Sequence, residues 1–270
     1  GMKPINVVVH GALGKMGREV ISALCHEPET RVVGAVEQKT TEDFLSLPDG
    51  FGRVSFSSDL DYILTTCRPD VLVDFSSAPA TRAAVPTASK RGVHLVIGTT
   101  GLTNSDLDEM AWLAKEHQVG IVVASNFALG AVMMMYLAKI AAKYFDYAEI
   151  IELHHHQKTD FPSGTALSTA RLMAQARGKP FFLPALEQGQ TSSGRGQQVE
   201  GVTIHSVRLP GLMAHQEVTF GVAGQTMSIR HDTVSRECYM PGVILAIKEV
   251  VKRPGLTNGL ETLLSLRETR

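Results

Sequence analysis

The chain has 270 residues, which is enough for one large domain or two modest ones, each with its own buried core. Hydrophobic residues make up 44% and charged residues 20% of the chain, and this composition excludes collagen-like, disordered and disulfide-scaffold proteins. The 26 Lys and Arg residues nearly balance the 27 Asp and Glu residues, so the formal net charge of -1 predicts no general attraction to nucleic acid or to an anionic membrane.

The first half of the chain carries short apolar runs that predict the strands of a parallel sheet. They are continuous rather than alternating, which is typical of strands covered on both faces. Helical spacing of apolar residues predicts helices between them, at 15–26, 80–90 and 105–117. We therefore expect a Rossmann-like, doubly wound α/β domain over residues 2–129. The predicted strands lie at 5–9, 31–36, 71–75, 93–97 and 120–124.

Two apolar segments raise the question of a membrane or a signal sequence. The run Val7–Val9 is stopped by His10 and a glycine-rich turn, which disfavours a signal peptide. The uncharged stretch 118–138 is long enough to span a membrane, but Ser125 and Asn126 interrupt it. We interpret it as a buried strand followed by a helix, and expect no membrane association.

The second half of the chain has a different pattern, which predicts a second, α+β domain over residues 130–240. A Met-rich helix ends near 144, and its methionines are most simply core residues. Pro241 can begin a last substantial helix at 242–252, and we expect the segment 241–270 to pack back on the first domain. Closely spaced strands predict a mixed or antiparallel sheet. The other predicted elements are a strand at 148–153, a helix at 164–177 and strands at 202–207, 217–220 and 227–231.

The turn after the first predicted strand has the spacing of a dinucleotide-binding loop. Glycines recur every third residue between that strand and the helix, so the backbone can approach a pyrophosphate at the helix N-terminus. Glu37 ends the second strand 20 residues after the last glycine, where a carboxylate can bind the adenosine ribose. Lys39 could hold a 2'-phosphate, so both NADH and NADPH remain candidates. The predicted loop residues are Gly11, Ala12, Leu13, Gly14, Lys15, Met16 and Gly17.

Polar and small residues follow two later strands of the predicted parallel sheet. They lie at carboxyl ends of strands, where open α/β sheets bind ligands. Loop residues also occur at strand ends for structural reasons alone, so the glycine turn is what favours a cofactor role for them. These candidates are Gly98, Thr99, Thr100, Ser125, Asn126 and Phe127.

The segment 152–166, ELHHHQKTDFPSGTA, combines three histidines and a lysine with a predicted helix start. Ser163 can cap that helix, which leaves the amides of Gly164 and Thr165 available to an anion. An imidazole, an ammonium and such amides suit a small carboxylate substrate that is protonated as it is reduced. Surface histidines before a capped helix are the simpler alternative. A zinc site is another alternative, but consecutive histidines lack the separated spacing of most zinc ligands, so we expect no metal.

The combination of these motifs resembles the dihydrodipicolinate (4-hydroxy-tetrahydrodipicolinate) reductase family, and the resemblance extends over nearly the full length. It rests on the turn 11–18, the segments 98–101 and 126–127, the segment 152–166, and 231–236. It implies NAD(P)H-dependent reduction of that substrate to tetrahydrodipicolinate, in the diaminopimelate route to lysine. It also implies a homotetramer formed through the substrate domain, in the cytoplasm or in a plastid. Cys25, Cys67 and Cys238 form no CxxC pair, which agrees with a reducing compartment.

The resemblance also implies roles for individual residues. His154 would donate the proton, Lys158 would stabilise developing charge, and His155, Gly164 and Thr165 would bind the dicarboxylate. A cleft between the two domains would hold the nicotinamide and the substrate in contact and exclude water.

The chain departs from the family pattern at one place, and its sequence leaves two other functions open. Many family members carry Arg after the acidic residue of the second strand, whereas this chain has Gln38 and then Lys39, so strict NADPH dependence is in doubt. Another nicotinamide-dependent dehydrogenase, of diaminopimelate or of an amino acid, would share the glycine turn. A nucleotide sensor or a metal-storing protein would use the histidines without turnover. The sequence does not rank the roles of Arg195 and Arg208.

Overall fold

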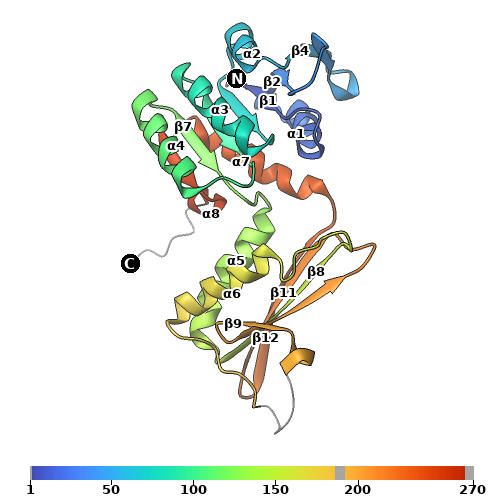
Figure 1. Ribbon diagram of the computed structural model, residues 1–270, viewed down its shortest axis with the longest axis vertical. Helices are drawn as coiled ribbons and strands as arrows, with labels where there is room; N and C mark the ends of the chain where they lie inside the picture. The colour runs from blue at the N-terminus through green and yellow to red at the C-terminus, as the bar shows by residue number, and fades with distance from the viewer. Residues whose placement is uncertain (1, 186–191, 265–270) are drawn as a thin grey trace. The chain divides into compact units, whose positions relative to one another are not determined.

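The computed structural model describes residues 2–185 and 192–264, which form two compact units. The first unit comprises Gly1–Leu129 together with Arg236–Arg270, and the second comprises Gly130–Ser235. Each unit has its own sheet and its own hydrophobic core. The chain thus leaves the first unit once and returns to it for its last described helices (Figure 1).

The first unit is built on an eight-stranded sheet in the order β13-β7-β6-β5-β1-β2-β4-β3. All neighbouring strands are parallel except β3 and β4, which pair antiparallel at one edge. The order reverses around β1, so the turns after β1 and β5 lie next to each other, as in a doubly wound fold. The strands are β1 (Ile5–His10), β2 (Thr30–Val36), β3 (Phe44–Ser46), β4 (Arg53–Ser57), β5 (Val71–Asp74), β6 (His94–Ile97), β7 (Gly120–Val123) and β13 (Gly255–Asn258).

Helices cover this sheet, and their ends follow local capping chemistry. Ser77 caps α3 and Thr103 caps α4 through a reciprocal capping box with Asp106. The predicted starts at 80 and 105 were therefore late by one or two residues, because both caps lie further upstream. The helices are α1 (Lys15–His26), α2 (Leu60–Cys67), α3 (Ala78–Lys90), α4 (Asn104–His117), α7 (Met240–Val250) and α8 (Leu260–Leu263), with short 3-10 turns at Pro48–Gly50 and Arg236–Tyr239.

The second unit is built on a five-stranded mixed sheet in the order β12-β11-β8-β10-β9. Strands β8 and β10 are parallel, and the other neighbours are antiparallel. The predicted α/β fold with a second domain on a mixed sheet is confirmed. The strands are β8 (Tyr147–His154), β9 (Gln197–Val199), β10 (Val202–Arg208), β11 (Ala214–Val222) and β12 (Gln225–Thr233); the helices are α5 (Leu129–Ala141) and α6 (Gly164–Arg177), with 3-10 turns at Ala142–Tyr144 and Ser192–Arg195.

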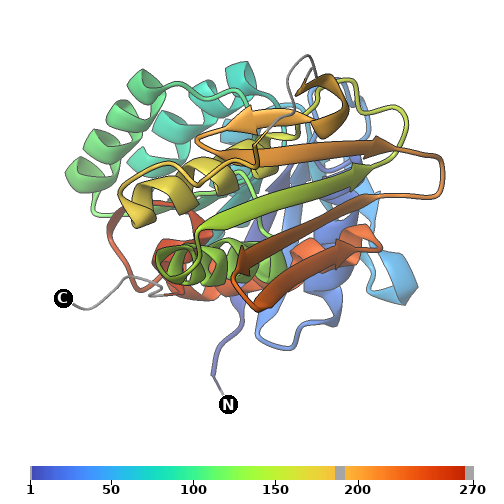
Figure 2. The same cartoon turned by 90° about the horizontal axis from the view of Figure 1, so that it is seen from below.

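Helices α5 and α6 pack on one face of this mixed sheet. Met134 and Met173 from the helices join Ile150 and Phe220 from the strands in one buried cluster. Among the described residues, no helix packs on the other face, which Figure 2 turns toward the viewer. Side chains alternate along β8, so Glu152 and His154 lie on the helix side and Ile151 lies on the open side.

Within the described residues, none of the helices is both long enough and apolar enough to cross a membrane. The uncharged stretch that raised this question forms strand β7 and helix α5, as predicted.

Candidate active site

The turn after β1 is a tightly packed glycine elbow. Gly11 has φ +80°, and a Cβ there would lie 2.6 Å from the carbonyl oxygen of Phe75, at the end of β5. A Cβ on Gly17 would lie 2.0 Å from the Gly11 carbonyl oxygen, so helix α1 touches the turn through backbone alone. Gly14 stands at the N-cap of α1 and has no side chain to bond the first-turn amides. These amides therefore face an anion site at the start of the helix.

The buried carboxylate of Asp74 lies next to this elbow. Asp74, at the end of β5, is fully buried and accepts hydrogen bonds from the Ser76 amide (2.9 Å) and the Thr81 hydroxyl (2.8 Å). The Thr81 oxygen also lies 2.9 Å from the hydroxyl of Thr99, at the end of β6. His10 Nδ1 lies 3.4 Å from the Asp74 carboxylate. Hydrogen bonds and a close contact to one buried carboxylate thus connect the ends of three strands.

A cavity of about 930 Å³ opens beside the elbow. Its volume, and the glycine turn without side chains that borders it, fit a dinucleotide. Of the predicted cofactor residues, Gly11, Leu13, Gly14 and Glu37 line it. The other lining residues carry no cofactor role predicted from the sequence: His10, Gln38, Ser58, Asp59, Leu60, Asp61, Phe75, Ser76, Ser77, Ala80, Ala83, Ala84 and Thr87.

Glu37 connects the second strand to the elbow. Its carboxylate accepts hydrogen bonds from the Leu13 amide (2.9 Å) and the Gln38 amide (3.1 Å). The carboxylate thus holds the glycine turn while lining the cavity. Lys39 is exposed and lies outside the set of lining residues, because the chain turns away from the cavity after Gln38.

The remaining predicted cofactor residues lie around the elbow or at other strand ends. Ala12 is buried below the turn, whereas Lys15 is exposed and Met16 half-buried in the first turn of α1. Gly98 allows the ring of Phe75 to pack on β6, since a Cβ there would lie 2.0 Å from that ring. Phe127 is buried against the same ring, at 5.7 Å between centroids. The exposed or half-buried residues at these ends are Thr100, Ser125 and Asn126.

In the second unit, a fully buried carboxylate lies two residues before His154 at the end of β8. Glu152 accepts a hydrogen bond from His154 Nδ1 at 2.5 Å and one from the Ser163 amide at 3.1 Å. Arg208, on the neighbouring strand β10, donates to both carboxylate oxygens, at 2.7 and 2.9 Å. Burial opposes ionisation of Glu152, but hydrogen bonds from His154, Arg208 and Ser206 outweigh it and lower the pKa of Glu152 to about 2.

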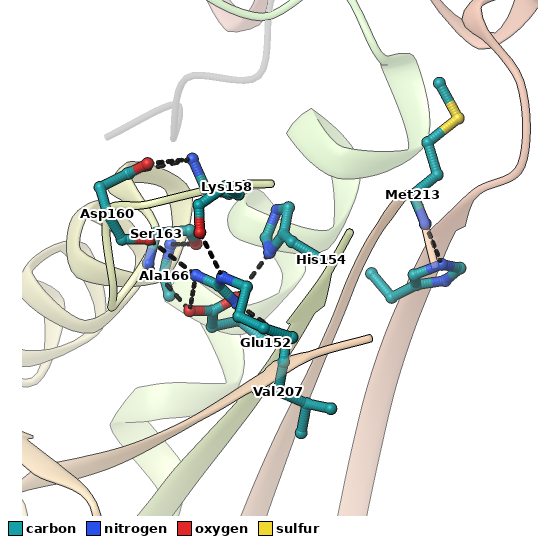
Figure 3. A network of polar contacts seen from close by, with 10 residues as sticks. Glu152, His154, Lys158, Asp160, Ser163, Ala166, Val207 and Met213 are labelled. Carbon is teal, nitrogen blue, oxygen red and sulfur yellow. Dashed lines mark hydrogen bonds and ion pairs between the residues drawn. The ribbon is translucent and has the colours of Figure 1, made fainter. Parts of the chain in front are cut away.

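Arg208 also holds the loop that carries Lys158. Its guanidinium donates to the carbonyl oxygens of Lys158 (3.2 Å) and Asp160 (2.8 Å). Lys158 Nζ in turn pairs with the Asp160 carboxylate at 2.8 Å (Figure 3). The Asp160 side chain is 63% exposed, so this pair is weak and leaves the ammonium available to a substrate.

Helix α6 begins directly beside this network. The Ser163 hydroxyl accepts from the Ala166 amide at 3.2 Å, so the predicted cap is confirmed. A Cβ built on Gly164 would meet no heavy atom within 4 Å, so open space adjoins the helix start. Gly164 is exposed and Thr165 is half-buried. The positive end of the α6 dipole is therefore accessible to an anion.

The structure separates the roles of the three histidines. His154 is half-buried, with its side chain 14% exposed, while His155 and His156 are exposed in the following turn. Among the described residues, no group of three or more His, Cys, Asp or Glu side chains is placed to hold a metal ion. The candidate active site thus brings together His154, Lys158 and the start of α6 around Glu152 and Arg208 (Figure 3).

Arg195 lies apart from this network. It pairs with Glu149, which also accepts from His205 Nε2 at 2.6 Å. Glu149 is three residues before Glu152 on β8, so it lies on the opposite face of the sheet. The structure therefore separates the two arginines that the sequence did not rank.

Comparisons with known proteins agree along the whole chain. The family models described as dihydrodipicolinate reductase, N-terminus, and dihydrodipicolinate reductase, C-terminus, match residues 5–127 and 130–264. The chain is 53% identical to the 4-hydroxy-tetrahydrodipicolinate reductase of Dehalococcoides mccartyi over 265 residues, which cover 98% of this chain and 100% of that protein. It is 47% identical to the protein of the same name from Moorella thermoacetica, over 96% of this chain and 98% of that protein. Among solved structures, it resembles the dipicolinate-bound dihydrodipicolinate reductase from Paenisporosarcina sp. TG-14, with a TM-score of 0.86 and 37% identity over 96% of this chain and 99% of that one.

Proposed function

The chain belongs to the dihydrodipicolinate reductase family, and from that premise we propose how its residues carry out the reaction. It catalyses the NAD(P)H-dependent reduction of 4-hydroxy-tetrahydrodipicolinate to tetrahydrodipicolinate, in the diaminopimelate pathway of lysine biosynthesis. One observation carries the assignment of residues: His154 and the N-terminus of α6 contact a buried carboxylate, and Arg208 joins that carboxylate to the loop that carries Lys158.

The cofactor is held by the first unit. Residues 11–17 receive the pyrophosphate at the start of α1, Glu37 binds the adenosine ribose, and Lys39, outside the cavity lining, attracts a 2'-phosphate by its charge. The cavity beside the elbow and the absence of a side chain at the Gly14 cap support this placement. When bound, the reduced nicotinamide supplies a hydride. The strand-end residues Gly98, Thr99, Thr100, Ser125, Asn126 and Phe127 complete the cofactor site in this proposal.

The substrate is a small dicarboxylate, and the second unit binds it. One carboxylate accepts hydrogen bonds from the amides of Gly164 and Thr165, where the α6 dipole favours negative charge. His155, exposed beside the network, adds a further donor. The open space at Gly164 supports this site, because a ligand can approach the helix start without displacing protein atoms.

His154 is the general acid in this proposal. Loss of water from the 4-hydroxy substrate gives a conjugated imine. Hydride addition to this imine leaves negative charge on a neighbouring ring carbon, and His154 protonates that carbon. A positioned general acid contributes a factor of roughly 10² to 10⁴ in rate, which corresponds to about 3 to 5 kcal/mol of barrier. Lys158 binds the substrate and stabilises the charge that develops on it before protonation.

The experiment that tests this function is a substrate-dependent assay. Freshly generated 4-hydroxy-tetrahydrodipicolinate is added to the purified protein with NADH or NADPH, and the loss of absorbance of the reduced nicotinamide is followed. Oxidation that depends on this substrate, and not on diaminopimelate or amino-acid substrates, supports the proposal. Nucleotide binding without turnover would contradict it.

For the cofactor, we expect both nucleotides to work, with kcat/KM values within about 100-fold of each other. Glu37 favours a free 2'-hydroxyl, whereas the ammonium of Lys39 attracts a 2'-phosphate. Replacing Lys39 with Ala should raise the KM for NADPH about fivefold, the size of one exposed ion pair, and leave the KM for NADH unchanged. Activity with only one nucleotide, or an equal change in both KM values, would contradict this assignment.

We propose that the enzyme assembles as a homotetramer through the open face of the second unit's sheet. This face carries Ile151, which is 38% exposed, together with Leu153 and Val207, between charged pairs. Apolar side chains on a flat, uncovered sheet favour association with another copy. Sedimentation equilibrium should give the mass of four chains of 29.2 kDa each, and Ile151→Lys should reduce it. A monomer mass for the parent protein would contradict the proposal.

We further propose a reducing compartment, the cytoplasm or, in a plant, the plastid stroma. Cys25 and Cys67 are free thiols. Burial raises the pKa of both thiols, with the charge of Asp49 adding to the effect at Cys25. Protonated, half-buried thiols agree with a protein that needs no disulfide.

A further inference from the structure

We propose that Glu152 is a positioning residue for His154: its carboxylate keeps a proton on Nδ1, so that Nε2 is the atom that delivers the proton to the substrate. The inference rests on the proposed role of His154 as general acid and deepens it. It also gives Arg208 a role, as the residue that holds the carboxylate in place.

The geometry leaves Glu152 one orientation. Its oxygen Oε1 accepts from the Ser163 amide and from Arg208, and its oxygen Oε2 accepts from Arg208 and from His154 Nδ1. Because the side chain is fully buried, each of these contacts replaces a hydrogen bond to water. Rotation of the carboxylate would leave buried donors unpaired, which costs more than the net gain of any single bond.

The charge state of Glu152 decides whether Glu152 or His154 donates the hydrogen bond between them. Its pKa of about 2 means that the carboxylate is ionised at neutral pH. An ionised carboxylate can only accept hydrogen bonds, so the proton in the 2.5 Å contact belongs to Nδ1 of His154. Neutral His154 therefore carries its proton on Nδ1 and presents Nε2 as the free nitrogen.

The proposed proton transfer returns His154 to its starting protonation state after each turnover. Protonated His154 holds one proton on each nitrogen. The Nε2–H bond breaks as the carbanion's electron pair forms a new C–H bond in the substrate, and the electrons of the N–H bond return to the ring. His154 is then neutral with its proton on Nδ1, and Nε2 takes a proton from water before the next turnover. Among the described residues, none forms a hydrogen bond with Nε2, which agrees with its use by the substrate.

Arg208 connects Glu152 to the loop that carries Lys158. The same guanidinium holds the backbone on either side of the loop from Lys158 to Asp160, and Glu152 itself holds the amide of Ser163 at the start of α6. The ion pair between Glu152 and Arg208 thus contacts the proposed acid, the loop that carries the ammonium, and the start of α6. A positioning role for Glu152 follows because its carboxylate contacts His154 and the Ser163 amide directly and is joined to the Lys158 loop through Arg208.

The test replaces Glu152 with Gln, which keeps the shape but removes one acceptor. Arg208 loses one acceptor in either orientation of the new amide; the NH₂ faces His154 because an imidazole nitrogen can accept after a change of tautomer, whereas the Ser163 amide can only donate. An NH₂ group can only donate, and it therefore favours the tautomer with the proton on Nε2. We expect kcat to fall on the order of 100-fold, the lower end of what a positioned acid contributes, while the Kd for NADH stays within about twofold.

The tautomer itself is measured by NMR of protein labelled with ¹⁵N and ¹³C histidine, assigned by the spectrum of His154→Gln. We expect neutral His154 to carry its proton on Nδ1 in the parent and on Nε2 in Glu152→Gln. A second variant, Glu152→Asp, keeps the charge toward Arg208 and should keep the parental tautomer, with kcat between those of the parent and Glu152→Gln. Glu149→Gln is the matched control, since it removes a carboxylate with Arg and His partners from the other face of the same strand; its kcat should stay within about twofold.

Parental kcat in Glu152→Gln, or an unchanged tautomer in that variant, would overturn the inference. If His154→Gln is slow while Glu152→Gln is not, the proposed acid stands and only its positioning by Glu152 falls. If His154→Gln itself keeps the parental kcat, the proposed function of His154 falls first.

Discussion

Replacing His154 with Gln is expected to lower kcat on the order of 10³-fold, with little change in the Kd for NADH or NADPH. The amide can neither gain nor lose a proton near neutral pH, so the carbon that becomes anionic has only water to protonate it. The proposed cofactor residues belong to the other unit, on the elbow after β1, so we expect nucleotide binding not to depend on this side chain. Steady-state kinetics with saturating substrate, together with a fluorescence titration of the nucleotide, measure both quantities.

His156 provides the matched control for this variant. It lies two residues further along, is exposed, and has no role in the proposed site. His156→Gln should keep kcat within about twofold of the parent. A turnover number for His154→Gln within the same range would show that another group donates the proton.

Replacing Lys158 with Ala is expected to lower kcat/KM by 10²- to 10³-fold, roughly the cost of removing one group that stabilises transition-state charge. Within the part of the chain that the structure describes, the ammonium pairs only with a largely exposed carboxylate, Asp160, so its loss removes little folding free energy. Arg208 holds this loop through the carbonyl oxygens of residues 158 and 160, and these contacts survive the substitution. The loop should therefore keep its conformation.

Thermal unfolding and kinetics with 4-hydroxy-tetrahydrodipicolinate separate the two effects. We expect Tm within a few degrees of the parent. Lys115→Ala, an exposed lysine in the last turn of α4, serves as a charge-matched control with unchanged kcat/KM. Near-normal kcat/KM in Lys158→Ala would remove this residue from the site.

The sequence predicted best those elements whose ends depend on local chemistry. Helices α1 and α6 have the predicted bounds, because Gly14 and Ser163 precede them and Gly178 ends α6 in a left-handed conformation. The region 44–57 was missed, because the short strands β3 and β4 exist only through pairing with each other and with β2. Strand β13 was missed for the same reason, since its partner β7 lies more than 100 residues earlier in the chain.

In the candidate site, too, the sequence predicted some residues and missed others. The glycine turn and the segment 152–166 are contiguous, so residue types and spacing alone pointed to them. The role of Glu152 was not predicted, because it depends on Arg208, which lies 56 residues away and meets it through the pairing of β8 with β10. Conversely, Lys39 is close to Glu37 in sequence but lies outside the cavity lining. Two residues that are close in sequence can be predicted to line the same cavity only where the direction of the backbone between them is also known.

The most direct measurement is a crystal structure of the protein with dipicolinate and a nicotinamide dinucleotide. We expect one ligand carboxylate within hydrogen-bond distance of the Gly164 and Thr165 amides, the ring beside Nε2 of His154, and the pyrophosphate at the first turn of α1. Dipicolinate bound elsewhere, with the start of α6 and His154 Nε2 left to water, would contradict it.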